Sequence, residues 1–319
     1  MPTIDVAAQV RAAEERARPY LLTTPAVSSI GLSAAVGSPV VLKCENLQRT
    51  GSFKARGAVS KVLSLTAEEL ERGIVTASTG NHGAAVAYAG SIVGVAPTVV
   101  VPDNANPSKL AAIERLGGHI EVQGTDSVES ELGARRAAEE RGLTFVSPYN
   151  DPAVIGGQGT LGLELLAQVP DLSAVFVAVG GGGLSSGVAG IVKAVSPGIR
   201  VIGCSPANSA VMYHSLQAGQ ILDMPSDPTL SDGTAGGVEP DAITFDILDA
   251  LLDDFVTVEE DAIREAFLEL IEVEHLLVEG SAAMAYAAAS ANARATEGTT
   301  AVILCGGNVG VEKLRGILG

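Results

Sequence analysis

The sequence predicts an α/β protein built of two open-sheet lobes, and three observations support that fold class. Short apolar segments alternate with segments of helical periodicity, which is the pattern of parallel strands joined by crossover helices. A length of 319 residues fits two lobes better than one. The composition, with 47% hydrophobic residues, 37 glycines and no tryptophan, is typical of a globular α/β chain.

The first half of the chain begins with a predicted helix and continues with short strands. An amphipathic helix is expected from Thr3 to about Ala17, ending before Pro19. Strands are expected over residues 40–43, 74–77, 98–101, 120–122 and 144–146, and helical patterns follow the second, third and fourth of these. This alternation predicts parallel pairing.

The second half repeats the pattern with more apolar strands. Residues 175–179, 201–204 and 301–305 are near-continuous apolar runs, as in strands buried on both faces. Helices are expected over 259–273 and 281–295, and residues 206–240 are expected to be mostly loop. Residues 172–192 carry no charge, but four central glycines favour a strand, a loop and a helix over a membrane span.

Charge and cysteine content exclude several classes of partner. The net charge of −17 repels phosphate backbones and anionic lipid surfaces, so we expect neither nucleic acid nor membrane partners. Three widely spaced cysteines indicate no disulfide framework and no metal cluster. A reducing, cytoplasmic location is expected, because the N-terminus has no apolar signal segment. No regulatory domain is expected after Gly319, the last residue given.

Lys54 is the candidate catalytic residue. A lysine forms a Schiff base when burial lowers its pKa and frees the amine. Phe53 and Ala55 flank it with apolar surface, Gly57 permits close backbone approach, and Ser52 is expected to cap a helix that begins just after it. Taken alone, the segment is better explained by a solvated lysine at the start of a surface helix, because most lysines have no chemical role.

Four successive glycines, Gly180, Gly181, Gly182 and Gly183, follow a predicted strand and open a helix. Backbone N–H groups and the helix dipole at such a point can bind a phosphate. The alternative is a tight turn, but four successive glycines exceed what a turn requires, so a phosphate site is predicted. The spacing does not match a dinucleotide-binding fingerprint, and no Gly-Lys-Ser/Thr follows for a nucleotide P-loop.

Two further loops follow predicted strands and are expected to meet the glycine loop at one cleft, because parallel sheets bind ligands at the carboxyl ends of their strands. The segment Ser78, Thr79, Gly80, Asn81, His82 offers hydrogen-bond donors that could bind a carboxylate. The alternative is that it only caps a helix, with His82 as a surface or core histidine. Cys305, before Gly306, Gly307 and Asn308, is either a core thiol or a group that faces a ring nitrogen.

Together these motifs resemble a known family. Ser52-Phe53-Lys54-x-Arg56-Gly57, Ser78 to Gly83, the four glycines and Cys305 to Asn308 are similar, in this order, to the motifs of fold-type II pyridoxal-phosphate enzymes. Within that group the chain resembles the serine/threonine dehydratases and serine racemases, and not the cysteine-synthase branch with its S-V-K-D-R motif. The resemblance covers nearly the whole chain and implies the tryptophan-synthase-β-like architecture.

The resemblance also implies domains and residue roles. Residues 1–72 and 151–319 would form a large cofactor-binding domain, and residues 73–150 a small domain that closes on substrate. Lys54 would bind pyridoxal 5'-phosphate as a Schiff base and then take the Cα proton. The other implied cofactor contacts are Phe53 at the ring, Asn81 at the phenolic oxygen, the four glycines at the phosphate, Glu279, and Cys305 at the pyridine nitrogen. Ser78, Thr79, Gly80, Asn81, His82 and Tyr149 would bind the substrate.

The implied reaction is β-elimination of water from a β-hydroxy amino acid such as L-threonine or L-serine, followed by release of a 2-oxo acid and ammonia. The cofactor phosphate would protonate the leaving hydroxyl. A neutral Cys305 beside the ring nitrogen would make the ring a milder electron sink than a carboxylate partner would, which favours elimination. The family also implies a homodimer.

Several positions depart from the family pattern. Thr79 stands where racemases have serine and many dehydratases alanine, so racemisation is an alternative activity. Ser205 and Val211 replace acidic metal ligands, so no metal is expected there. Glu279-Gly280-Ser281-Ala282 replaces Glu-Pro-x-x-Ala, and Tyr149 replaces phenylalanine or asparagine.

Two further alternatives remain. The Ser-Thr-Gly-Asn-His-Gly pattern also resembles dehydratases of hydroxyectoine catabolism, which would act on a larger hydroxy amino acid. Fold-level reasoning always leaves a non-catalytic binding or regulatory protein open. The presence together of Lys54, Asn81 and the glycine loop argues against that alternative.

Overall fold

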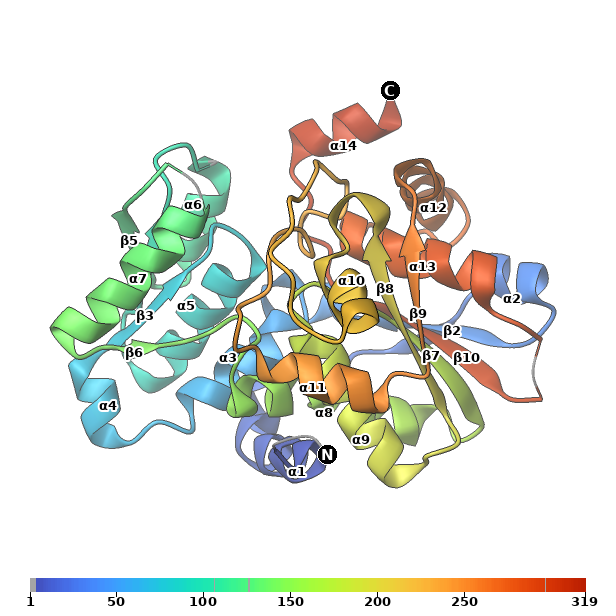
Figure 1. Cartoon of the computed structure of the whole chain (residues 1–319), viewed down its shortest axis with the longest axis horizontal. Helices are drawn as coiled ribbons and strands as arrows, with labels where there is room; N and C mark the ends of the chain where they lie inside the picture. The colour runs from blue at the N-terminus through green and yellow to red at the C-terminus, as the bar shows by residue number, and fades with distance from the viewer. Residues whose placement is uncertain (1–3, 106, 126, 296) are drawn as a thin grey trace.

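The computed structural model describes residues 4–105, 107–125, 127–295 and 297–319, which form two β-sheets surrounded by helices (Figure 1). In these residues the larger sheet has the strand order β1-β2-β10-β7-β8-β9 and the smaller β5-β4-β3-β6. The strands are β1 (Ala26–Ser28), β2 (Val40–Cys44), β3 (Ile74–Ala77), β4 (Thr98–Val101), β5 (His119–Val122), β6 (Thr144–Phe145), β7 (Leu172–Ala178), β8 (Arg200–Pro206), β9 (Asp254–Val258) and β10 (Thr299–Leu304).

Strand pairing confirms the predicted α/β class. Neighbouring strands of both sheets run parallel, apart from β1, which pairs antiparallel with β2 at one edge. The central strands β7 and β10 are almost wholly buried, as their continuous apolar sequences predict. Because the strands are parallel, their carboxyl ends lie at one edge of each sheet.

Helices cover both faces of the larger sheet. Figure 1 shows α12 and α13 on one side and α1, α8 and α9 on the other, and α13 packs across β7, β8, β9 and β10. The helices associated with this sheet are α1 (Val6–Ala17), α2 (Ile30–Val36), α8 (Pro152–Gln168), α9 (Gly183–Val195), α10 (Val211–Ala218), α11 (Ile243–Leu251), α12 (Glu260–Glu272), α13 (Gly280–Asn292) and α14 (Val311–Leu318).

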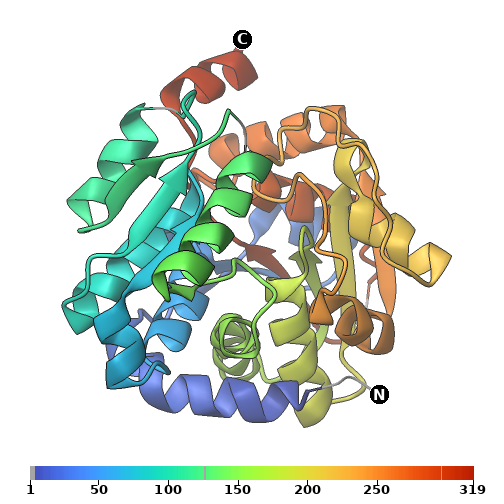
Figure 2. The same ribbon diagram turned by 60° about the vertical axis from the view of Figure 1, so that its left-hand side comes forward.

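The smaller sheet lies beside the larger one and is joined to it through α3. Helix α3 packs against α5 of the smaller unit and against α8 of the larger one, while α1 runs along the base of the molecule (Figure 2). The remaining helices are α3 (Lys54–Val62), α4 (Ala67–Arg72), α5 (Asn81–Val93), α6 (Pro107–Arg115) and α7 (Ser127–Arg141), with short 3₁₀ turns η1 (Arg18–Tyr20), η2 (Glu45–Leu47), η3 (Arg49–Gly51) and η4 (Ala207–Ser209).

Local sequence explains where several elements begin. Helix α1 begins at Val6, later than expected, because the Asp5 side chain accepts the N–H of Ala8 and caps it; Thr3 lies outside the described residues. Helix α8 begins at Pro152 behind Asp151, whose carboxylate accepts two backbone N–H groups.

The elements that were not predicted include β1, β9, α10 and α11. Strands β1 and β9 are the two edge strands of the larger sheet and are less buried than its centre. Residues 206–240 are mostly loop, as expected, apart from η4 and α10. Helix α10 ends where Gly219 adopts a left-handed conformation with φ 68°. No helix within the described ranges has the length and apolar character needed to cross a membrane.

Candidate active site

One cavity of about 820 Å³ lies at the carboxyl ends of β3, β7 and β10. The loops after these three strands all line it, which confirms the prediction that they converge on one cleft. Every candidate site residue named from the sequence borders this cavity: Phe53, Lys54, Ser78, Thr79, Gly80, Asn81, His82, Tyr149, Gly180, Gly181, Gly182, Gly183, Glu279 and Cys305.

Lys54 is the first residue of α3, and its backbone is tied to the end of β10. Ser52 pairs with Gly306 in an isolated antiparallel bridge, and the N–H of Phe53 donates to the carbonyl of Cys305 at 3.0 Å. The expectation that Ser52 caps the helix is wrong, because Phe53 is the capping residue and makes no side-chain bond to the helix. The attachment to β10 therefore positions Lys54.

The Lys54 amine faces the cavity with few polar partners. Its Nζ donates to the carbonyl oxygen of Pro148 at 2.9 Å and lies 5.2 Å from the centre of the Phe53 ring. Burial lowers the pKa of Lys54 to about 8, against the opposing charges of Glu279 and Cys305. A larger share of this amine is thus neutral near pH 7 than for an ordinary lysine, as a nucleophilic amine requires.

The glycine loop forms one wall of the cavity because side chains would not fit there. A Cβ at Gly181 would lie 2.5 Å from the Tyr149 ring, and one at Gly180 would lie 2.9 Å from the backbone of Thr234. Gly182 has φ +89° and precedes α9. A tight turn explains Gly182 but not the close approach at Gly180 and Gly181. The first N–H groups of α9 have no partners within the helix and can bind an anion.

Asn81 begins α5 and is held by two neighbours. Its Nδ2 donates to Glu279 Oε2 at 2.8 Å, while its Oδ1 accepts from Asn308 Nδ2 at 2.7 Å. The alternative of a side-chain helix cap is excluded for this helix, since Gly80 occupies the capping position. The loops after β3 and β10 are thus hydrogen-bonded to each other through Asn81 and Asn308.

His82 is a buried histidine with one partner. Its Nε2 lies 2.9 Å from the carbonyl oxygen of Val146, and Nδ1 has no protein partner within the described chain. Burial lowers the pKa of His82 to about 3, and the nearby Lys54 charge adds to this effect. The imidazole is therefore neutral at physiological pH, which supports the core-histidine interpretation of its side chain.

Glu279 and Cys305 form a buried pair at the base of the cavity. The Cys305 thiol donates to Glu279 Oε1 across 3.7 Å. Burial raises the pKa of Glu279, although Asn81, Cys305 and the backbone of Asn308 donate to its carboxylate, and burial also raises the pKa of Cys305. The thiol is thus neutral, and its hydrogen points toward the carboxylate.

Comparison with known proteins agrees with this site. The family model described as "Pyridoxal-phosphate dependent enzyme" matches residues 18–306. The chain belongs to the pyridoxal-phosphate-dependent enzyme family. It is 40% identical to L-threonine ammonia-lyase of Geobacter sulfurreducens over 96% of this chain and 76% of that protein, and 38% identical to serine racemase of Oryza sativa subsp. indica over 94% and 90%.

Solved structures of this pyridoxal-phosphate family share the fold. Maize serine racemase matches with a TM-score of 0.90 at 35% identity, covering 98% of this chain and 96% of that one. A bacterial structure described as a T.th. threonine deaminase matches with a TM-score of 0.87 at 39% identity, covering 95% and 98%. The predicted family and its fold-type II architecture are confirmed.

The cavity fits pyridoxal phosphate chemically. An aldehyde needs an amine with a lowered pKa, which Lys54 provides. A phosphate needs unpaired N–H groups and an approach free of side chains, which the glycines before α9 provide. A planar aromatic ring needs an apolar surface such as Phe53, which borders the same cavity. The individual contacts implied by the family stay predictions.

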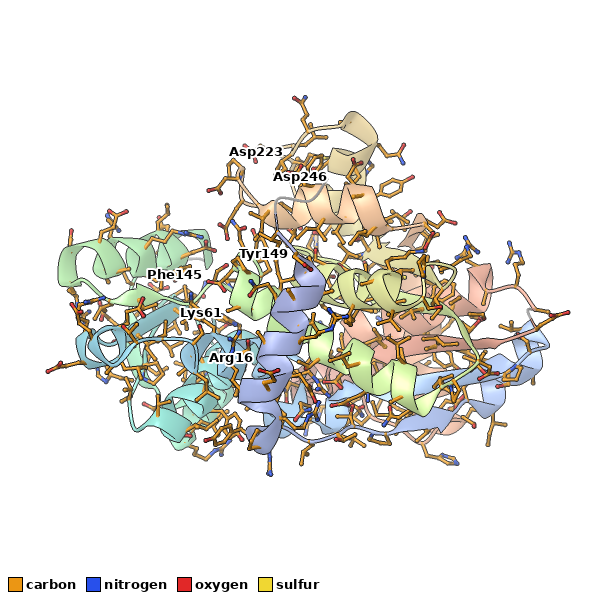
Figure 3. All side chains as sticks on the ribbon, turned by 90° about the horizontal axis from the view of Figure 1, so that it is seen from below. Arg16, Lys61, Phe145, Tyr149, Asp223 and Asp246 are labelled. Carbon is orange, nitrogen blue, oxygen red and sulfur yellow. The ribbon has the colours of Figure 1, made fainter. Side chains whose placement is uncertain are left out.

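The positions that depart from the family pattern have distinct surroundings. Thr79 and Tyr149 both line the cavity, and the Tyr149 hydroxyl accepts the N–H of Glu239 at 2.8 Å. Figure 3 labels Tyr149 in the view from below. Ser205 donates to the carbonyl of Val179. The described residues include no group of three or more His, Cys, Asp or Glu side chains placed to hold a metal.

Sequence reasoning missed several cavity residues. The loop before α11 brings Asp232, Gly233 and Thr234 to the cavity, and the small unit contributes Lys109, Arg115 and Glu131. An Asp-Gly pair signals only a turn, and charged residues on amphipathic helices usually face solvent. No sequence signal marked the Pro148 carbonyl, because any residue supplies a backbone acceptor.

Proposed function

We propose that this chain is a pyridoxal-phosphate-dependent ammonia-lyase that removes water from a β-hydroxy amino acid such as L-threonine or L-serine. The enamine product then takes up water and releases a 2-oxo acid and ammonia. The observation that carries this proposal is the desolvated Lys54 amine facing a glycine-lined anion site across one cavity. Bound pyridoxal phosphate supplies the electron sink that stabilises negative charge at the substrate Cα.

The residues of the chain bind, orient and move protons in this proposal. Lys54, once displaced by substrate, takes the Cα proton, because its pKa of about 8 suits a base near neutral pH. The N–H groups and hydroxyls of the Ser78 to His82 loop bind the substrate carboxylate. The four glycines bind the cofactor phosphate, Asn81 donates to the phenolic oxygen, and Cys305 faces the pyridine nitrogen.

Racemisation is the second candidate function, because Thr79 carries a hydroxyl group. Its hydroxyl lines the cavity where serine racemases carry the serine that protonates the opposite face of the substrate. Relatives named serine racemase are 37–38% identical to this chain. The Thr79 methyl group crowds this position relative to serine, which favours elimination over racemisation. Whether the natural substrate is larger than threonine depends on the Tyr149 side of the cavity.

The organisation of the protein is part of the proposal. We place the small substrate-closing domain at residues 73–150 and the large cofactor-binding domain at 1–72 and 151–319, a division supported by the two separate sheets. We also propose a cytoplasmic homodimer. Sedimentation velocity of the purified protein tests the dimer, and limited proteolysis with and without substrate tests closure of the small domain.

A keto-acid assay tests the activity. Purified protein loaded with pyridoxal phosphate is given L-serine, L-threonine and larger β-hydroxy amino acids, and 2-oxo acid and ammonia are measured together. Equal amounts of both are expected, and release of neither from any hydroxy amino acid overturns the proposal. L-serine in deuterated water separates the second function: D-serine carrying deuterium at Cα indicates racemisation, whereas pyruvate without D-serine excludes it.

A further inference from the structure

Glu279 is a buried carboxylate without an ion-pair partner. It is 5% exposed, and within the described ranges no lysine, arginine or histidine lies within ion-pair distance of it. It precedes α13 at the capping position yet makes no side-chain bond to that helix. Burying an unpaired carboxylate is costly, so a capping role does not explain this residue.

The surrounding backbone leaves room for this carboxylate. A Cβ at Gly306 would lie 2.7 to 2.9 Å from the Glu279 carboxyl atoms, and one at Gly233 would lie 3.4 Å from Oε1. Two loops therefore use glycine where they pass the carboxylate. Its two oxygens are then directed at different residues, with Oε2 accepting from Asn81 and Oε1 from Cys305.

The carboxylate determines which way the Asn81 amide points. A flipped amide would place its oxygen against Glu279 Oε2 and its NH₂ against the NH₂ of Asn308, so both contacts would become repulsive. In the observed orientation Nδ2 gives one hydrogen to Glu279 and keeps the second. Asn81 thus remains a donor toward the cavity, as binding a phenolic oxygen requires.

The same carboxylate determines the direction of the Cys305 thiol. Because the single S–H hydrogen is donated to Oε1, the sulfur presents only lone pairs to any other neighbour. A ring nitrogen facing this sulfur can donate to it but cannot accept from it. Without Glu279 the thiol could turn and become a donor.

We propose that Glu279 is a positioning residue that sets the hydrogen-bond direction of both Asn81 and Cys305, the groups assigned to the phenolic oxygen and the pyridine nitrogen of the cofactor ring. This inference rests on the proposed function, because the ring contacts come from it. Glu279 acts through these two neighbours, so its replacement should change the affinity and the electronic state of bound pyridoxal phosphate more than the stability of the fold.

The experiment compares Glu279→Gln with Glu260→Gln in pyridoxal-phosphate titrations of stripped protein. Glu260 is a matched control, because it is partly buried and its carboxylate accepts a backbone N–H, from Leu230. In Glu279→Gln the amide has one hydrogen-bond acceptor oxygen instead of two, and its NH₂ group is a new donor. We therefore expect the dissociation constant for pyridoxal phosphate to rise about tenfold or more and the visible absorbance band to move. The control should match wild type in both.

A double variant separates positioning from general structure. In a Cys305→Ala background, Glu279→Gln should produce a smaller band shift than in wild type, because one of the two groups that it orients is gone. Equal shifts in both backgrounds, or a lowered thermal midpoint with an unchanged band and affinity, overturn the inference. If wild-type protein itself shows no band with pyridoxal phosphate, the proposed function fails instead.

Infrared spectroscopy tests the thiol without any change at Glu279. Cys44 and Cys204 donate to backbone carbonyls, and Cys305 donates to a carboxylate. The S–H stretch that disappears in Cys305→Ala holoprotein should lie at a lower frequency than the two that remain, because hydrogen bonds to charged acceptors are stronger. A frequency equal to that of a free thiol contradicts the inference, even if Glu279→Gln does not fold.

Discussion

Two buried groups of ionisable residues each include a residue of α3, and they differ in whether their charges are paired. The first, here called the base cluster, consists of Lys43, Glu45, Arg56 and Glu164. Arg56 contacts Glu45 at 2.7 Å and Glu164 at 2.8 Å, and Lys43 contacts Glu164 at 2.6 Å. Burial disfavours the charged carboxylate, but Arg56 and Lys43 outweigh it and lower the pKa of Glu164 to about 2.

The second group, here called the cavity cluster, consists of Lys54, His82, Glu279 and Cys305. Within the described residues none of these four is in an ion pair, and burial is the largest influence on each. The pKa of Lys54 falls to about 8 and that of His82 to about 3, while the pKa values of Glu279 and Cys305 rise. Burial acts toward the neutral form in every case, but the hydrogen bonds that Glu279 accepts from Asn81 and Cys305 stabilise its carboxylate.

The difference shows how one helix serves both stability and chemistry. Arg56 and Lys54 are two residues apart at the start of α3, so the paired charges of the base cluster anchor the turn that carries the unpaired amine. Because the base cluster fixes the backbone, Lys54 needs no ion pair of its own. The cavity cluster keeps its hydrogen-bonding capacity for a ligand.

The largest expected effect is the loss of activity in Lys54→Ala. We expect the rate of keto-acid release to fall by about 10²- to 10⁴-fold, because the base for the Cα proton is lost. The thermal midpoint of the protein should not fall, since no ion pair is broken. Lys61→Ala is the control: Lys61 lies on the same helix and pairs with Asp151. Activity of Lys54→Ala within tenfold of the control would show that Lys54 is not the base.

Arg56→Met tests the base cluster, where stability should change instead. Two carboxylates, Glu45 and Glu164, would lose their main buried partner, and we expect the free energy of unfolding to fall by about 3–5 kcal/mol. Urea denaturation of cofactor-free protein measures this loss. Arg72→Ala, which breaks an exposed pair with Glu68, should cost under about 1 kcal/mol. Similar losses in the two variants would contradict the comparison.

The sequence predicts the cavity better than the base cluster, because the contacts of the base cluster join residues that are far apart in the sequence. The strand and loop alternation predicted the three loops of the cavity, because each motif is local and parallel strands bring their carboxyl ends together. The base cluster was not predicted: Arg56 and Glu164 are 108 residues apart, and no local pattern links them. Lys43 was correctly placed in a strand, but its burial depends on a partner from α8.

The contact between Glu279 and Asn81 shows the same limit within the site. The two residues are 198 positions apart, and their hydrogen bond forms only when the loop after β3 meets the segment before α13. Family resemblance indicated that both residues contact the cofactor, but not that they contact each other. The edge strands β1 and β9 were missed for a related reason, since partial exposure removes the continuous apolar pattern that identified β7 and β10.

The pH dependence of stability sharpens the comparison for Lys54. Its folded pKa of about 8 lies below the ordinary value of 10.5, so above pH 8 the unfolded chain binds the proton that the folded chain has lost. Unfolding therefore takes up a proton, and the stability of cofactor-free protein should rise by up to about 3 kcal/mol between pH 8 and 10.5 relative to Lys54→Met. Denaturation midpoints of both proteins across this range measure it. Parallel curves would mean that the Lys54 pKa is normal.

The smallest effect on stability is expected for an ion pair that is partly exposed to solvent. Arg135 of α7 contacts Glu239 of the larger unit at 3.0 Å and stacks on the Phe145 ring, with its side chain 38% exposed. The N–H of Glu239 donates to the hydroxyl of Tyr149, which lines the cavity. This pair therefore connects the two units beside the cavity.

We expect Arg135→Ala to lower the free energy of unfolding by under about 1 kcal/mol, as for other solvent-accessible pairs. The KM for the amino acid should nevertheless rise, because the contact that holds Glu239 and Tyr149 against the small unit is lost, while kcat changes little. Arg141→Ala is the matched control: its pair with Glu121 is also on the small unit but does not reach the larger one. If both variants have the same KM as wild type, the Arg135 pair behaves as an ordinary surface contact.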